Sequence, residues 1–210
     1  MKSLLVCGIL APVLYILSDI ILGLSWKSYS FNTQSISELS AIGAPTRLCW
    51  ILVSFLFNPL LIGFGIGIVK ATATKLRIAG FLLALWGALG FVWLFFPMHL
   101  RGAIGSPTDT MHLVMAGITV PLMICFIALG SRARGKGFRT YSIFTIILML
   151  TFGAITASQA SLVAAQQPTP WLGIIERVSV YSPMVWVAVL ALLLLEQKIR
   201  KEVNYHEIKK

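Results

Sequence analysis

Three residues whose side chains bind metal ions or move protons lie near the middle of the chain: His99, Asp109 and His112. Asp109 and His112 are spaced i,i+3, so a helix that begins near Asp109 presents both on one face. A His, Asp, His set is able to hold Zn²⁺ with one position left for a water molecule, which the metal turns into a nucleophile. The spacing therefore predicts a zinc site and catalysis by these residues, with Glu176 as a fourth ligand or general base.

The same segment also has a structural interpretation. Ser106, Pro107 and Asp109 stand where an N-cap, a first helical residue and an acidic third residue are favoured. On this interpretation Asp109 caps a helix, and the two histidines pack or form hydrogen bonds at the membrane interface. The sequence leaves both interpretations open.

A second group of candidates surrounds the start of the last apolar run. Glu176 and Arg177 are adjacent there, and Tyr181 follows one turn after Arg177. Arginine binds phosphate and carboxylate through two parallel hydrogen bonds, so Arg101 and Arg177 are candidate ligands for an anionic lipid headgroup. The structural alternative is that Glu176 pairs with one of these arginines. Asp19 interrupts an apolar run and needs one of the same two partners, which adds it to the ligand-binding candidates.

A short amphipathic segment, residues 35–43, lies in the first long loop and ends at a glycine. We expect a half-helix that closes over the mouth of the polar site, with Ser37 and Glu38 as ligand-binding residues. The alternative is a surface helix that rests in the interface, where the spacing of Ser35 and Glu38 is that of a capping box.

The composition decides which elements must position these residues. Of the 210 residues, 58% are hydrophobic and 11% are charged, and the mean hydropathy is +0.88, which excludes an ordinary soluble fold. Six apolar runs have the length that a membrane span needs: 4–24, 48–69, 78–96, 111–130, 141–164 and 178–195. We therefore predict an all-α polytopic membrane protein with six transmembrane helices in residues 1–197, followed by a basic cytoplasmic tail, 198–210.

The distribution of positive charge predicts the orientation. Thirteen of the 17 Lys and Arg residues lie near the chain ends or in the short loops 70–77 and 131–140. Because positive loops stay in the cytoplasm, both termini are predicted to be cytoplasmic, and the candidate residues above lie at the outer end. The net charge of +10 thus reflects membrane orientation in the cell membrane. We expect membrane lipids as partners and no nucleic acid, because the basic clusters lack interleaved aromatic residues.

Four features form a recognisable pattern: SISEL with GAP at 35–45, Phe96-Pro97, the pair Asp109 and His112, and Glu176-Arg177. In this pattern the chain resembles the DUF998 family of prokaryotic membrane proteins over almost its whole length. The resemblance implies the six spans and the same outer polar residues. It implies no reaction, since the family has no established activity.

Three classes of function follow. The first is a lipid-modifying enzyme or metal-dependent membrane hydrolase, with zinc as the cofactor and an outer-leaflet site. The second is a binding or transport protein for an anionic headgroup or small solute, and the third is a structural membrane subunit. Transport is the weaker of the first two, because the inner half of the spans is almost wholly apolar.

Overall fold

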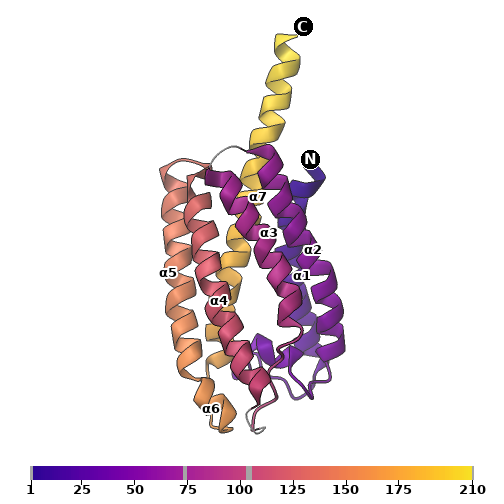
Figure 1. Ribbon diagram of the computed structural model, residues 1–210, viewed down its shortest axis with the longest axis vertical. Helices are drawn as coiled ribbons and strands as arrows, with labels where there is room; N and C mark the ends of the chain where they lie inside the picture. Colours follow the sequence, from indigo (N-terminus) through magenta and orange to yellow (C-terminus); the bar gives the residue numbers. More distant parts are fainter. Residues whose placement is uncertain (1, 73–74, 103–105, 210) are drawn as a thin grey trace.

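The computed structural model of the protein describes residues 2–72, 75–102 and 106–209. Among these residues, six helices are long and apolar enough to cross a membrane, which confirms the predicted fold class (Figure 1). These helices are α1 (Lys2–Ser25), α2 (Arg47–Ala71), α3 (Lys75–Trp93), α4 (Pro107–Gly130), α5 (Lys136–Ser158) and α7 (Leu172–Ile208). Three short helices, η1 (Ile36–Ser40), η2 (Ser131–Ala133) and α6 (Ala160–Ala164), lie in the connections.

The two ends of the bundle differ in what they carry. Both chain termini lie at one end, which we call the terminal face, and the long connections 26–46, 94–102 and 165–171 lie at the other, which we call the loop face (Figure 1). Helix α7 continues into the predicted basic tail as far as Ile208 and projects beyond the bundle. That the terminal face is cytoplasmic stays a prediction.

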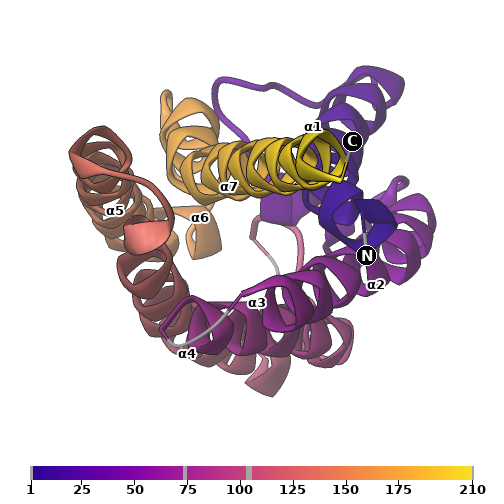
Figure 2. The same cartoon turned by 90° about the horizontal axis from the view of Figure 1, so that it is seen from above.

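The long helices follow one another around the bundle. Helix α1 packs against α2, α2 against α3, and α3 against α4, whereas α7 packs between α1 and α5 (Figure 2). Helices α4 and α5 touch only weakly. The closest pair, α2 and α3, approaches backbone to backbone: a Cβ at Gly65 would lie 2.4 Å from the carbonyl oxygen of Gly80, so only small residues fit there.

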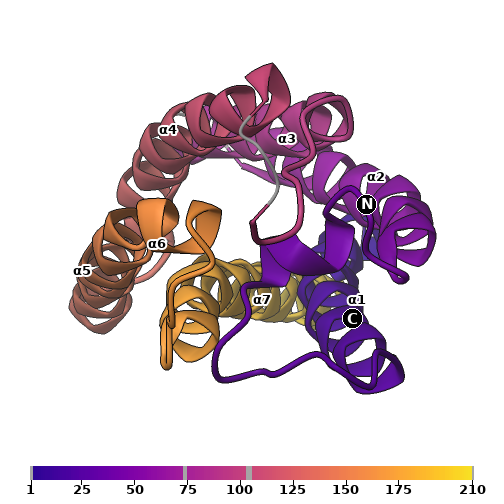
Figure 3. The ribbon, with the colours of Figure 1, turned by 90° about the horizontal axis from the view of Figure 1, so that it is seen from below.

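Aromatic rings fill the interior toward the terminal face. Trp86 of α3 stacks on Phe126 of α4 with centroids 5.4 Å apart, and Trp186 of α7 lies 5.8 Å from both Phe126 and Phe138. The indole N–H of Trp186, which would be costly to bury alone, donates to the hydroxyl of Ser142 on α5 at 2.8 Å. These rings tie four helices together at one end. At the loop face, η1 and the described segment after α3, residues 94–102, extend across the middle of the bundle (Figure 3).

Candidate functional site

A buried ion pair joins the first and last long helices at the loop face. Arg177 of α7 donates from Nε and Nη2 to the two carboxylate oxygens of Asp19 on α1, at 2.8 and 2.9 Å. The hydroxyl of Tyr181 donates to the same carboxylate. Asp19 has no exposed surface, so water cannot stabilise its charge. The hydrogen bonds from Arg177 and Tyr181 do so instead. The prediction that an arginine from another helix satisfies Asp19 is confirmed.

The remaining donors of Arg177 fix the first loop. Its Nη1 donates to the carbonyls of Phe31, Gln34 and Gly173 at 3.0 to 3.3 Å, and its Nη2 donates to the hydroxyl of Tyr29 at 2.7 Å. Burial raises the pKa of Tyr29, so this hydroxyl keeps its proton and passes a hydrogen bond to the carbonyl of Ser35. Because all three nitrogens of Arg177 have partners, it offers no free donor to an anionic headgroup.

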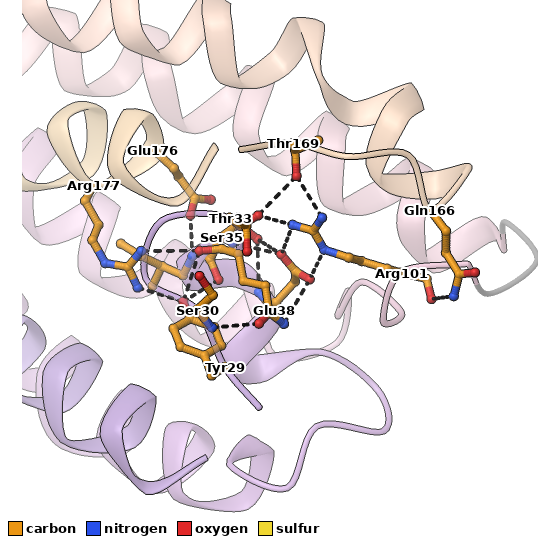
Figure 4. A network of polar contacts seen from close by, with 12 residues as sticks. Tyr29, Ser30, Thr33, Ser35, Glu38, Arg101, Gln166, Thr169, Glu176 and Arg177 are labelled. Carbon is orange, nitrogen blue, oxygen red and sulfur yellow. Dashed lines mark hydrogen bonds and ion pairs between the residues drawn. The ribbon is translucent and has the colours of Figure 1, made fainter. Parts of the chain in front are cut away.

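A second arginine holds the three connections of the loop face together. Arg101 donates from Nε and Nη2 to Glu38 at 2.6 and 3.0 Å, from Nη1 to the hydroxyl of Thr169 at 2.7 Å, and from Nη2 to the carbonyl of Thr33. Glu38 is fully buried. Figure 4 shows these contacts beside those of Arg177. Arg101 thus links its own segment to the first loop and to the connection before α7, and like Arg177 it is already satisfied by protein groups.

Glu176 binds the first loop instead of an arginine. Its carboxylate accepts hydrogen bonds from the backbone N–H of Ile36 and, at 3.2 Å, from the hydroxyl of Ser37. Among the described residues, Arg101 pairs with Glu38 and Arg177 with Asp19, so the ion pair of Glu176 with either arginine does not form there. Adjacent side chains on a helix project about 100° apart, so Arg177 faces α1 while Glu176 faces η1.

Within the 35–43 segment, in which a half-helix was predicted, residues Ile36–Ser40 form the short helix η1. That this helix closes the mouth of a ligand site stays a prediction. Helix η1 packs against α1, α2 and α7, and its capping box of Ser35 and Glu38 is present. Leu39, a residue of η1, is fully buried. Glu176 of α7 and Arg101 of the 97–102 segment also form hydrogen bonds with η1. Helix η1 is therefore held in place by contacts from two other parts of the chain.

His99 and Asp109 form a hydrogen-bonded pair at the start of α4. The Nδ1 atom of His99 lies 3.0 Å from one carboxylate oxygen of Asp109, and the backbone N–H of His99 donates to the other at 2.7 Å. The backbone N–H of Ser106 donates to the same carboxylate at 2.9 Å, so the predicted helix-capping role of Asp109 is confirmed. Among the residues described, nothing hydrogen-bonds the Nε2 atom of His99, and the side chain is 28% exposed.

His112 does not join this pair. Its Nδ1 atom lies 3.0 Å from the carbonyl oxygen of Phe96, a group just beyond the end of α3 that lacks a helical partner. Its ring packs edge-on against Trp93 at 4.7 Å. In the described part of the chain, no group of three or more His, Cys, Asp or Glu residues is placed to hold a metal. The predicted three-ligand zinc set does not form, and Glu176 is engaged elsewhere.

Four partners in these networks were not singled out from the sequence: Tyr29, Thr33, Gln166 and Thr169. Gln166, for example, donates to the carbonyl of Arg101 at 3.0 Å. Each lies in a connection and meets its partner across 65 to 148 residues, so no spacing rule links them. The one available signal was that buried arginines need more acceptors than two carboxylates supply.

An open groove lies between α5 and α7 along the side of the bundle. It encloses about 430 Å³ and is lined mainly by apolar groups, with Arg177 and Tyr181 at its side nearest the loop face. Phe144, Ile174 and Val185 in its lining are more than 40% exposed. The groove follows α7 from Ile174 to Val185, about 16 Å of helix, which is close to half the thickness of the hydrocarbon core.

Comparison with known proteins places the chain in a family. The family described as "Protein of unknown function (DUF998)" matches residues 9–193, most of the chain. No curated protein and no solved structure matches it.

Proposed function

Because the chain belongs to the DUF998 family, whose activity is unknown, we propose from the geometry of the loop face that it is a plasma-membrane hydrolase acting on lipid esters of the outer leaflet. The observation that carries this proposal is the His99–Asp109 pair. Asp109 holds the Nδ1 side of the ring, which leaves Nε2 directed away from its partner and available as a general base.

The reaction uses water and no metal. Nε2 of His99 removes a proton from a water molecule as its oxygen attacks the ester carbonyl or phosphorus, and Asp109 stabilises the imidazolium that forms. The imidazolium then gives its proton to the departing alkoxide, so one ester and one water become an acid and an alcohol. The role of Asp109 is to fix the ring orientation, as the third group does in related catalytic arrangements.

The two arginine networks support the site indirectly. Arg101 holds the segment that carries His99, and the backbone N–H of Ile42 donates to the carbonyl of Met98 at 2.8 Å. A catalytic ring works only when its position is held by a rigid surround. The remaining charged candidates, Asp19, Glu38 and Glu176, are therefore positioning residues in this proposal.

The test uses purified protein in vesicles that contain each main class of phospholipid and acylglycerol, with products identified by mass spectrometry. The variant His99→Gln is expected to lower product formation at least about 100-fold, a typical loss for a general base. His112→Gln is the matched control, since that histidine lies nearby but outside the pair. Equal activity in His99→Gln and wild type, or no product from any lipid class, overturns the proposal.

A second candidate is a lipid-binding protein without catalysis. The α5–α7 groove favours it, because its length fits one acyl chain of the outer leaflet. A phospholipid with a photoreactive group in its acyl chain should then cross-link to α5 and α7, and Val178→Trp should block this by filling the groove. Cross-linking spread evenly over the lipid-facing helices, including Ile118 of α4, contradicts this candidate.

A further inference from the structure

A second cavity lies at the opposite end of the bundle, where α7 leaves the other helices. It encloses about 400 Å³ between the end of α2 and the start of the α7 extension. Its lining residues are Ala71, Thr72, Leu194, Gln197, Lys198, Lys201, Glu202 and Tyr205. The hydrolase proposal uses none of them.

The cavity combines an apolar floor with a cationic wall. Leu194 belongs to the buried core, and Lys198 and Lys201 follow it by one and two turns on the same side of α7. Gln197 and Thr72 add neutral hydrogen-bonding groups. An apolar floor with lysines one and two turns above it matches the division of a phospholipid into an acyl chain and a phosphate headgroup.

Glu202 does not cancel the positive charge of this wall. Its carboxylate lies 2.5 Å from the Nζ atom of Lys2 and 4.0 Å from that of Lys198. Lys2 and Lys198 therefore share this carboxylate, and Lys201 adds a further positive charge to the lining of the cavity. The side chain of Lys198 is only 20% exposed, so its stem is packed against the protein while Lys198 lines the cavity.

We propose that this cavity binds the headgroup of an anionic phospholipid from the leaflet at the terminal face, with Lys198 and Lys201 contacting the phosphate. A basic pocket between helices at the cytoplasmic side of a membrane is a known form of headgroup site. The predicted orientation places the terminal face at the leaflet that is rich in anionic lipid. This site is independent of the proposed hydrolase.

The test measures binding of short-chain phosphatidylglycerol and phosphatidylcholine to the purified protein in detergent, by tryptophan fluorescence and by thermal stabilisation. Phosphatidylglycerol should bind and phosphatidylcholine should not. Lys198→Gln with Lys201→Gln should weaken binding about 30-fold, since each lysine near an anionic surface contributes roughly a five-fold factor. Arg134→Gln with Arg200→Gln is the matched control, because it removes the same charge from exposed positions outside the cavity.

Two further measurements keep the test decisive. Thr72→Trp fills the cavity without changing any charge, and it should abolish phosphatidylglycerol binding. This variant keeps the proposal testable if the lysine variant fails to fold. Free glycerol 3-phosphate should bind much more weakly than the lipid, because it lacks an acyl chain for the apolar floor. Equal weakening by the two charge variants, unchanged binding in Thr72→Trp, or equal affinity for glycerol phosphate and lipid overturns the proposal.

Discussion

The ion pairs at the two faces of the bundle differ in how far they are exposed to water. At the loop face, Asp19 and Glu38 have no exposed surface, and their arginine partners are 11% and 21% exposed. At the terminal face, Glu196 is 38% exposed and pairs with Arg134 and Arg200, which are 47% and 74% exposed. Ion pairs of the first kind are costly to break, whereas those of the second kind contribute little, because water already stabilises each partner.

The difference indicates what each face requires. The loop face must hold three connections of irregular backbone against the bundle, and its charged side chains replace water as partners for loop carbonyls and N–H groups. The terminal face has short turns and a helical extension, whose backbone needs no such support. The described ion pairs Asp19–Arg177 and Glu38–Arg101 of the loop face are thus buried and fully hydrogen-bonded. The pairs of Glu196 at the terminal face are exposed to water.

The largest expected contrast is in topology. A variant without the three native cysteines receives a single new cysteine, either at Thr110 at the loop face or at Lys136 at the terminal face. In intact cells a membrane-impermeant maleimide should label the first and not the second, because the Lys and Arg bias predicts that the terminal face is cytoplasmic. Equal labelling of the two positions contradicts the predicted orientation, and labelling after lysis checks that both cysteines react.

The second effect is on stability at the loop face. Arg177→Met leaves Asp19 buried without its counter-charge, and the free energy of unfolding should fall by about 3–5 kcal/mol. Unfolding in detergent with added denaturant measures this change. Asp19→Asn combined with Arg177→Met should recover a large part of the loss, since no lone charge is then buried. A fall below about 1 kcal/mol for the single variant would place this pair with the exposed ones.

A smaller effect is expected for the pair that links the connections to one another. A double-mutant cycle of Glu38→Gln and Arg101→Met should give a coupling energy of roughly 1–3 kcal/mol, the range for contacting residues in one network. Arg101 is more exposed than Arg177, so water compensates more of a lost contact. We therefore expect this coupling energy to be smaller than the loss of stability in Arg177→Met. Additive losses, with no coupling, would mean that the contact between Glu38 and Arg101 does not stabilise the loop face.

The elements were predictable from the sequence because each depends on local composition. Six spans followed from apolar runs, and the capping segments before α4 and at η1 followed from residue spacing. The boundaries of the helices were less predictable. Helix α7 begins at Leu172, whereas the predicted start is residue 178. The predicted start is too late because the first turns of α7 carry Glu176 and Arg177. A hydropathy window treats such charged turns as lying outside the membrane span.

The pairing of side chains was only partly predictable. That Asp19 needed an arginine followed from the cost of burying a carboxylate, but that Glu38 takes Arg101 depends on how two loops meet. The zinc prediction failed for the same kind of reason. The i,i+3 spacing of Asp109 and His112 describes one face of a helix, yet the orientation of the His112 ring is set by the free carbonyl of Phe96 on another segment.

The smallest expected effect is at the terminal face, and it completes the comparison. Glu196→Gln removes the carboxylate shared by Arg134 and Arg200, but all three side chains are in contact with water. The variant should unfold within experimental error of wild type at 0.5 M salt, because exposed charges are screened over less than 10 Å there. Any difference should appear only at low salt and shrink as salt is added. A loss as large as that of Arg101→Met, unaffected by salt, would mean that the terminal face holds its charges as rigidly as the loop face does.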